Sequence, residues 1–421
     1  MQVGETDREH FYYGANGRAL HDGWLTAALR LAGGSMRQKR LCFSRGEMQE
    51  TDAMHKTCLL MLAALLLWVG FGVSGQPGEP PLAAPLVAFD TAAQDRIMLV
   101  EAATGRQRTL SFGPVAQRVW GFSPDGCRLL LTMSVGTSPA RLYTARLDGG
   151  DLREAGALGV DEGAWDPTFS PDGQRIVFTL SRPEAGREAT GGRSHRIAVA
   201  DVATGAVETV SVSGDEHTPR WSPNGQWIAY SAYETDEAGN RAADLWVASV
   251  NDSTRTRLTD FPSGSVTMPR WSPDGDLIGF VYSAEPSRDT LWMIGNAAGA
   301  LPTQLSYAPA LALDLTWLPG GASMLAVLRD FRAETSSRLW QIPLVGIADY
   351  DGQIFPPTAA ALYPDYPRFS PDGGRLALRS AYALALIELP GGEVALLPNS
   401  EGNTPPVWSP AALAGEAQCS S

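Results

Sequence analysis

The chain of 421 residues is 44% hydrophobic and 19% charged, and it contains 44 glycines and 30 prolines. This composition is typical of a globular, turn-rich protein and excludes a disordered chain or a coiled coil. The formal net charge of -13 argues against nucleic-acid binding, which needs a clustered basic face. No lysine follows Lys56, which excludes a P-loop or Schiff-base lysine in the folded body.

A short apolar run precedes the folded body. Residues 59–73 carry no charge, follow Lys56 and lead into small residues that end at Gly75. A basic flank, a short apolar core and small terminal residues are typical of a secretory signal peptide, whereas a membrane-spanning helix needs about 20 apolar residues. We therefore expect an exported protein, periplasmic or extracellular, with an uncleaved membrane anchor as the alternative.

A short signature recurs along the rest of the sequence: an aromatic residue followed by Ser-Pro-Asp-Gly or Ser-Pro-Asn-Gly. The five near-complete copies begin at Phe122, Phe169, Trp221, Trp271 and Phe369. A degenerate copy begins at Trp317 and a truncated one at Trp408. A repeat of about 40–50 residues indicates a propeller or another repeat array.

Each copy begins the same local pattern. The aromatic residue ends one strand, and a tight turn follows because Pro presets φ near −65° and Asp-Gly tolerates positive φ. An apolar second strand comes next, such as IVFTL from Ile176, and then a third strand and a short polar fourth strand, HRIAVADV and AVETVSV. Four short strands separated by such turns make one propeller blade.

The two ends of the repeat array complement each other. Residues 85–111 hold three strands without a signature, and Trp408 has a signature with almost nothing after it. We predict an all-β fold with a single propeller of seven four-stranded blades, closed by N- and C-terminal strands, and six blades are the alternative.

Met48 or Met54 would each start a normal export signal. The expected parts are a non-native extension, a signal peptide or anchor, a Pro/Gly-rich linker, the propeller and a tail, at residues 1–53, 54–75, 76–84, 85–411 and 412–421.

The signature, with a Pro just ahead of it in TPRW, MPRW and YPRF, resembles the WD40-like (PD40) repeats of TolB-type propellers. Similar repeats form the propeller of prolyl-oligopeptidase-like peptidases. The resemblance covers residues 85–410 and implies the fold rather than a function, because propellers host many roles. TolB proper has a small α/β domain followed by six blades, whereas the repeats of this sequence indicate seven. The resemblance therefore does not imply a role in the Tol envelope system.

Repeated polar residues of the signature are expected to be structural. A ring of Asx residues suggests metal ligands, but turn formation explains them without a metal, and Asn224 and Gly320 interrupt the ring. The residues assigned to the structural motif are Phe122, Asp125, Phe169, Asp172, Trp221, Asn224, Trp271, Asp274, Trp317, Phe369, Asp372 and Trp408. Arginines precede the aromatic residue at Arg220, Arg270 and Arg368. Inter-blade salt bridges are favoured for them over an anion site in the channel.

Known catalytic patterns are absent from the sequence. There is no G-x-S-x-G elbow, no C-x-x-C and no H-E-x-x-H, and only His195 and His217 lie in the repeat region. We therefore expect a non-catalytic protein without cofactor or metal. The alternatives are a propeller hydrolase or lactonase with a channel metal, and the propeller subunit of a prolyl-oligopeptidase-like peptidase.

Loops between the second and third strands lie on the face opposite the Ser-Pro-Asp-Gly turns, and the longest spans residues 181–194. Loops on a rigid scaffold commonly carry binding residues, and these loops are polar. We predict a monomer that binds a protein partner there and contacts a membrane only through the N-terminal segment, with solvated loops as the alternative. The same face also carries the loops between blades, which contain most of the candidate residues: Asp161, Glu162, Asp215, Glu216, His217, Tyr233, Asp260, Tyr363, Asp365 and Tyr366.

Two cysteines remain beyond the export segment. Cys127 follows the first Ser-Pro-Asp-Gly turn, and Cys419 follows Trp408 in the adjacent closing blade, on the same face. A disulfide between them is one possibility, and it would stabilise the ring by about 2–4 kcal/mol. Two unrelated, unpaired cysteines are favoured over it.

Overall fold

The computed structural model describes residues 80–420 apart from 185–191, 211–214, 236–238, 240, 253, 286–287, 307–309, 330–336, 345–352, 356–363, 381–382, 399 and 401–403. The chain divides into two compact units, Met1–Gly70 and Phe71–Ser421, and the described residues belong to the second. The predicted extension and signal peptide lie outside the described residues. Within the described part, none of the helices is long and apolar enough to cross a membrane.

The regular secondary structure of the described residues consists almost entirely of β-strands. In chain order they are β1 (Leu86–Asp90), β2 (Ile97–Glu101), β3 (Gln107–Leu110), β4 (Ala116–Phe122), β5 (Arg128–Ser134), β6 (Arg141–Arg146), β7 (Arg153–Glu154), β8 (Gly163–Phe169), β9 (Arg175–Pro183), β10 (Arg193–Asp201), β11 (Val207–Thr209), β12 (Asp215–Trp221), β13 (Trp227–Thr235), β14 (Arg241–Ser249), β15 (Arg255–Arg257), β16 (Ser265–Trp271), β17 (Leu277–Ser283), β18 (Asp289–Gly295), β19 (Thr303–Gln304), β20 (Leu311–Trp317), β21 (Ser323–Arg329), β22 (Ser337–Pro343), β23 (Gln353–Ile354), β24 (Pro364–Phe369), β25 (Arg375–Ser380), β26 (Ala383–Glu388), β27 (Val394–Leu397) and β28 (Val407–Trp408). The short 3-10 helix η3 (Glu416–Ser420) ends the described chain.

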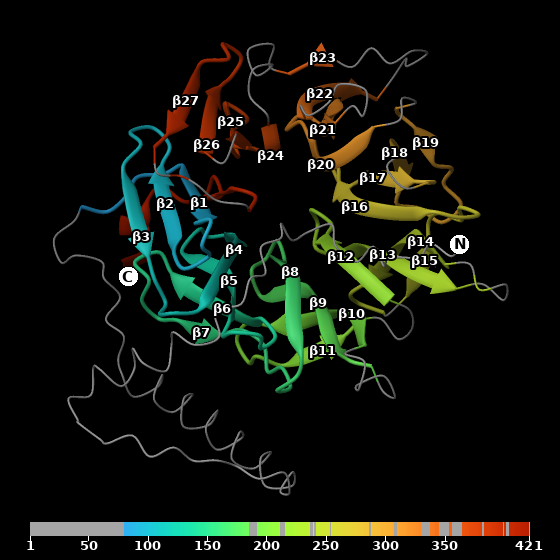
Figure 1. Ribbon diagram of the computed structural model, residues 1–421, viewed down its shortest axis with the longest axis horizontal. Helices are drawn as coiled ribbons and strands as arrows, with labels where there is room; N and C mark the ends of the chain where they lie inside the picture. The colour runs from blue at the N-terminus through green and yellow to red at the C-terminus, as the bar shows by residue number, and fades with distance from the viewer. Residues whose placement is uncertain are drawn as a thin grey trace, which may run out of the picture. The chain divides into compact units, whose positions relative to one another are not determined.

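The strands form antiparallel sheets that follow one another around a ring (Figure 1), and the propeller fold is confirmed. Five sheets have four strands each: β28-β1-β2-β3, β4–β7, β8–β11, β20–β23 and β24–β27. The sixth sheet has eight strands, because one parallel pair, Ala243 opposite Ser265, joins β14 to β16. The number of separate sheets therefore differs from the predicted seven, although this sheet contains two successive four-strand units, β12–β15 and β16–β19.

The ring closes between the two ends of the propeller, as predicted. Strand β28 pairs with β1 through Val87 opposite Trp408 and Ala88 opposite Val407. Around this pair, the Leu86 N–H donates to Ser409 Oγ (2.9 Å), and the Ser409 N–H donates to the Leu86 carbonyl. Figure 1 shows the blue β1–β3 beside the red β24–β27. Closure satisfies strand edges that would otherwise be free to pair with other chains.

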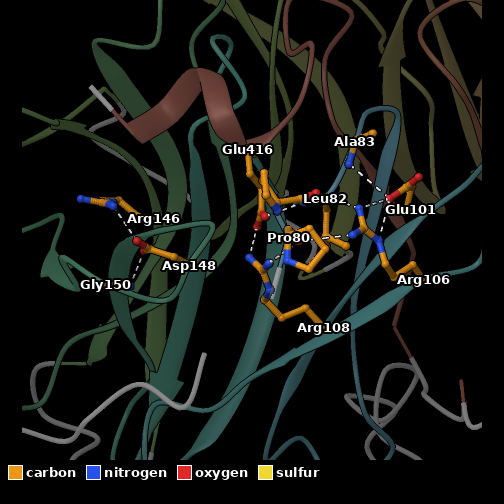
Figure 2. Close-up of polar contacts among 11 residues, drawn as sticks. Pro80, Leu82, Ala83, Glu101, Arg106, Arg108, Arg146, Asp148, Gly150 and Glu416 are labelled. Atoms are coloured by element: carbon orange, nitrogen blue, oxygen red, sulfur yellow. Dashed lines mark hydrogen bonds and ion pairs between the residues drawn. The ribbon is translucent and has the colours of Figure 1, made fainter. Parts of the chain in front are cut away.

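A set of contacts that we call the terminal clasp holds both ends of the propeller together (Figure 2). The carboxylate of Glu416 accepts a hydrogen bond from the Leu82 N–H (2.8 Å) and pairs with Arg108. Cys127 and Cys419 form a disulfide with a Cα–Cα distance of 5.3 Å, so the pairing that the sequence left as the less favoured possibility is present in the structure. The clasp therefore fastens the last residues to the closing blade and to its neighbour.

The repeated signature folds into one turn that recurs in the five near-complete copies. In the first copy, Ser123 Oγ donates to Asp125 Oδ1 (2.5 Å), which also accepts the Cys127 N–H (3.0 Å). The turn glycine adopts φ +78° at Gly126, a left-handed conformation that disfavours side chains. The same bonds occur at Asp172, Asn224, Asp274 and Asp372. Turn formation thus accounts for the repeated Asx residues.

The signature tryptophans join each blade to the one before it. Their indole N–H groups donate to the carbonyl that precedes the aromatic residue of the previous blade, for example from Trp271 to Arg220 (3.0 Å). Trp221, Trp317 and Trp408 repeat the contact. The apolar core likewise lies between successive sheets, as where Leu86 and Leu99 pack with Leu129. Burial of these faces supplies the main stabilising contribution.

Candidate functional site

A pocket of about 600 Å³ lies where the innermost strands end, beside the Ser-Pro-Asp-Gly turns. Its lining includes aromatic residues of the signature and prolines of the turns. The aromatic lining residues are Trp120, Phe122, Phe169, Trp221, Trp271, Phe369 and Trp408, and the prolines are Pro124, Pro171, Pro223, Pro273 and Pro406. Trp, Tyr and Arg are the residues most enriched at the energetic centres of interfaces.

The residue immediately before each signature aromatic occupies an equivalent position around this pocket. Around the ring these residues are Val407, Gly121, Thr168, Arg220, Arg270, Thr316 and Arg368. Three of them are arginines: Arg220 and Arg270 lie on neighbouring blades, and Arg368 lies two blades after Arg270. All three line one half of the pocket, and Val407, Gly121 and Thr168 line the other half. One half of the pocket is therefore cationic and the other half is small and uncharged.

Inter-blade ion pairs, the role favoured from the sequence, involve all three arginines. Arg220 forms a two-pronged pair with Asp166 (2.7 and 2.9 Å). The buried Asp314 pairs with Arg270 (3.3 Å) and with Arg368 (2.5 Å). Three guanidinium groups thus face two carboxylates in this network.

The network keeps an excess of positive charge at a buried position. Burial, together with the positive charges of Arg220 and Arg368, lowers the pKa of Arg270 to about 10. Burial raises the pKa of Asp314, but Arg368 and Arg270 outweigh it and hold that pKa below its ordinary value. An anionic group brought into the pocket would relieve the mutual repulsion of the arginines.

Four innermost strands carry the same strained bulge just ahead of the pocket. Asp166, Thr218, Met268 and Tyr366 adopt φ between +51° and +55°, and each precedes a proline. Such left-handed non-glycine residues cost about 1–3 kcal/mol each and cluster at functional sites. Tyr366, expected in a binding loop, belongs to this bulge of β24 instead. Asp365 also lies on β24, and burial raises its pKa to about 6.

The other candidates for the loop face are mostly engaged within the protein. Glu162 accepts the Gly159 N–H (2.8 Å), and the exposed Asp260 pairs with Arg257 (2.7 Å). The carbonyl of Asp161 accepts a hydrogen bond from Arg193 (2.7 Å). Tyr363 lies outside the described residues. Asp161 and Glu162 lie in the loop before β8 and Asp260 lies in the loop before β16, so these residues do not converge on one site.

At the start of β12 the structure brings together residues that are far apart in the sequence. His195 Nδ1 lies 2.7 Å and His217 Nε2 lies 3.1 Å from Asp215 Oδ1. His195 lies on β10 of the preceding blade, so its approach to His217 depends on tertiary structure. The spacing of Asp215 and His217 was the sequence signal that could have placed these two side chains together, because residues two apart on a strand share one face.

The expectation of a surface role for Glu216 was wrong. Glu216 points to the opposite side of β12 and is fully buried, where its carboxylate accepts the Ile197 N–H (3.3 Å) and lies 3.5 Å from Arg255. Burial raises its pKa to about 7. The strand alternation that exposes its neighbours is the reason that it faces inward.

We predict that Glu216→Gln stabilises the protein at pH 8 and has little effect near pH 4.5. A carboxyl whose pKa is raised on folding contributes fully at low pH, and that stability is lost as pH rises from the unfolded pKa through the folded value near 7. We expect a gain of about 1–2 kcal/mol, less than the full linkage value because the pair with Arg255 is lost. Urea unfolding at both pH values measures it, and an equal effect at both would contradict the buried charge.

Comparisons with known proteins agree with this fold. The family model described as the PD40 TolB beta propeller domain matches residues 183–414. The uncharacterized peptidase YuxL of Bacillus subtilis (strain 168) is 32% identical over 181 residues, covering 36% of this chain and 27% of that protein. The chain thus spans about a quarter of the length of that relative.

Solved structures show similar propellers at low sequence identity. A puromycin-hydrolyzing peptidase of Mycobacterium tuberculosis has a TM-score of 0.55 and 14% identity, over 75% of this chain and 53% of that one. TolB from Acinetobacter baumannii has a TM-score of 0.46 and 18% identity, over 77% of this chain and 82% of that one. At these identities the similarity concerns the fold alone.

Proposed function

The chain belongs to the PD40 TolB beta propeller domain family, and from that premise we propose that it is an exported, non-catalytic binding module for a protein partner. The proposed binding site is the central pocket, and the proposed ligand is an acidic, extended segment of the partner. The observation that carries the proposal is the pocket of about 600 Å³, whose lining includes signature aromatic residues and the three arginines Arg220, Arg270 and Arg368.

The shape and charge of the pocket support an acidic segment as its occupant. A carboxylate directed at Arg220, Arg270 and Arg368 would meet a planar donor array suited to carboxylate groups. The chain of the partner would leave across Gly121 and Thr168, where the lining side chains are small. Burial of apolar atoms against the aromatic lining residues would add to the affinity.

The loop face remains the competing location. Its carboxylates support it less well, because Glu162, Asp215 and Asp260 lie at the starts of three different blades and do not converge on one place. The pocket, in contrast, concentrates aromatic and cationic groups in one concave place, which is the usual form of a binding site.

Export rests on two features of the chain. The apolar run at residues 59–73 is typical of a signal peptide. The disulfide between Cys127 and Cys419 is of a kind that persists in oxidising compartments. A cell-fractionation experiment with antibodies against the propeller tests this part of the proposal.

Thr168 offers matched variants that test the pocket. It occupies the ring position equivalent to that of the arginines and forms no ion pair itself, so its substitution removes none of the charged groups that pair with Asp166 and Asp314. Thr168→Arg adds a fourth guanidinium, and Thr168→Glu adds a carboxylate that competes with the ligand. We expect a partner captured from envelope extract to bind a few-fold more tightly to the first variant and about tenfold more weakly to the second.

Loop-face and salt controls complete this experiment. Asp260→Ala, on the opposite face, should leave capture unchanged, and raised salt should weaken it because the attraction is electrostatic. If Asp260→Ala abolished capture and Thr168→Glu left it unchanged, the binding site would lie on the loop face. No specific capture by any of the proteins would reject the binding-module proposal.

A second candidate is the propeller subunit of a peptidase. The similarity to YuxL and to the puromycin-hydrolyzing peptidase favours it, because both names describe peptidases and this chain covers only part of each. Co-purification of a separate serine-hydrolase subunit that reacts with a fluorophosphonate probe would support this function over a simple binding module.

A further inference from the structure

His195, Asp215 and His217 form a group of potential metal ligands between two neighbouring blades. His195 lies on β10, and the other two residues lie on β12. Their ligand atoms all lie within 4.8 Å of one another, with Asp215 Oδ1 between the two imidazoles. We propose that these three side chains bind a divalent transition-metal ion, for which Zn²⁺ fits the donor set best.

The donors and their spacing are those of a zinc site. Two imidazole nitrogens and a carboxylate oxygen bind Zn²⁺ at about 2.0–2.2 Å, so neighbouring ligands of a tetrahedral ion lie about 3.3 Å apart. The present separations from Asp215 Oδ1 are 2.7 Å to His195 and 3.1 Å to His217. The two histidine nitrogens would need to move away from Asp215 Oδ1 by only about 0.6 and 0.2 Å, and all three ligand atoms already lie within 4.8 Å of one another.

Access to the group is sufficient for an ion to enter and keep an open position. The side chains of His195, Asp215 and His217 are 23%, 30% and 31% exposed. Three protein ligands therefore leave a fourth position for water or for a donor from another molecule, as in zinc sites that are not purely structural.

Contacts around the three ligands orient them. Arg241 pairs with the other carboxylate oxygen of Asp215, Oδ2, and leaves Oδ1 directed at the histidines. The Arg241 guanidinium lies 4.3 Å over the Tyr233 ring, which meets the His217 ring edge-on at 5.8 Å. Such outer contacts commonly hold metal ligands in place. Burial raises the pKa of Asp215, but hydrogen bonds from His195 and His217 outweigh it and hold that pKa below its ordinary value.

The position of the group gives the ion a measurable effect on stability. An ion held by β10 and β12 would connect the β8–β11 blade to the β12–β15 blade. Because the unfolded chain does not hold these ligands together, binding would stabilise the folded protein.

Zinc titration of the full chain tests the proposal. The metal-free protein, purified with a tag that lacks histidine, is titrated with ZnCl₂ by calorimetry beside His195→Gln/His217→Gln and Asp260→Asn variants. We expect wild type and Asp260→Asn to bind one more zinc ion per chain than the double variant, and Zn²⁺ to raise their thermal midpoints by several degrees more.

Cobalt substitution distinguishes this site from others in the chain. Co²⁺ bound here should show a four-coordinate spectrum without a thiolate charge-transfer band, whereas cysteines of the N-terminal segment would produce that band. If the double variant does not fold, His217→Gln alone retains the bond between His195 and Asp215 and serves instead. Equal zinc stoichiometry in wild type and in the folded variant would overturn the proposal, and so would the absence of binding by wild type.

Discussion

Asp314→Asn is expected to lower the free energy of unfolding by about 3 kcal/mol at pH 7. The carboxylate is 4% exposed and pairs with both Arg270 and Arg368, and it also accepts the Leu315 N–H (2.8 Å). Asparagine has nearly the same shape and retains an acceptor, but it leaves two guanidinium groups without their shared counter-charge. Removing one partner of a buried ion pair typically costs 3–5 kcal/mol. We take the lower end because both arginines keep backbone carbonyl acceptors.

The pH dependence of this effect has a definite sign. The pKa of Asp314 is lowered in the folded protein, so its contribution is complete above the unfolded pKa near 4 and is lost as pH falls through the folded value. The difference between wild type and Asp314→Asn should therefore shrink below about pH 4. Asp260→Asn, which removes a carboxylate that is 87% exposed, should change stability by less than about 0.5 kcal/mol. Similar losses in the two variants would show that the network does not behave as a buried one.

The propeller was predictable because its determinants are local and repeated. A Ser-Pro-Asp-Gly turn requires only neighbouring residues, as the bond from Ser123 to Asp125 illustrates. Closure was predictable for a related reason, since three unpaired strands at one end matched a solitary Trp408 strand at the other. The link between β14 and β16 was not, because it is one backbone pair that no side-chain pattern specifies.

The candidate sites depended more on contacts between blades. The three pocket arginines were recognisable from their position before the aromatic residue, but their partners Asp166 and Asp314 lie in other repeats, and no spacing rule indicated them. Asp215 to His217 were interpreted as a loop, whereas they begin β12. Because these residues form a strand and not a loop, Glu216 points into the interior, and Asp215 and His217 point toward His195.

Removal of the disulfide by Cys127→Ser/Cys419→Ser is expected to lower the free energy of unfolding by about 2–4 kcal/mol. The two cysteines are 292 residues apart, so the bond closes almost the entire propeller into one covalent loop. In the chain-entropy view, a loop of this length restricts the unfolded chain strongly. Strand β28 pairs with β1 at only two positions, and the disulfide supplements this short closure.

Urea unfolding measures this loss. Both proteins also carry Cys42→Ser and Cys58→Ser, so that Cys127 and Cys419 are the only cysteines of the disulfide-containing protein. Reductant should bring the disulfide-containing protein to the stability of the variant and leave the variant unchanged. Glu416→Gln removes the charge that pairs with Arg108, and because both side chains are largely buried it should cost about 2–3 kcal/mol in either redox state. If reductant left the stability of the disulfide-containing protein unchanged, the paired β-strands and the Glu416 contacts would be sufficient to close the ring without a covalent bond.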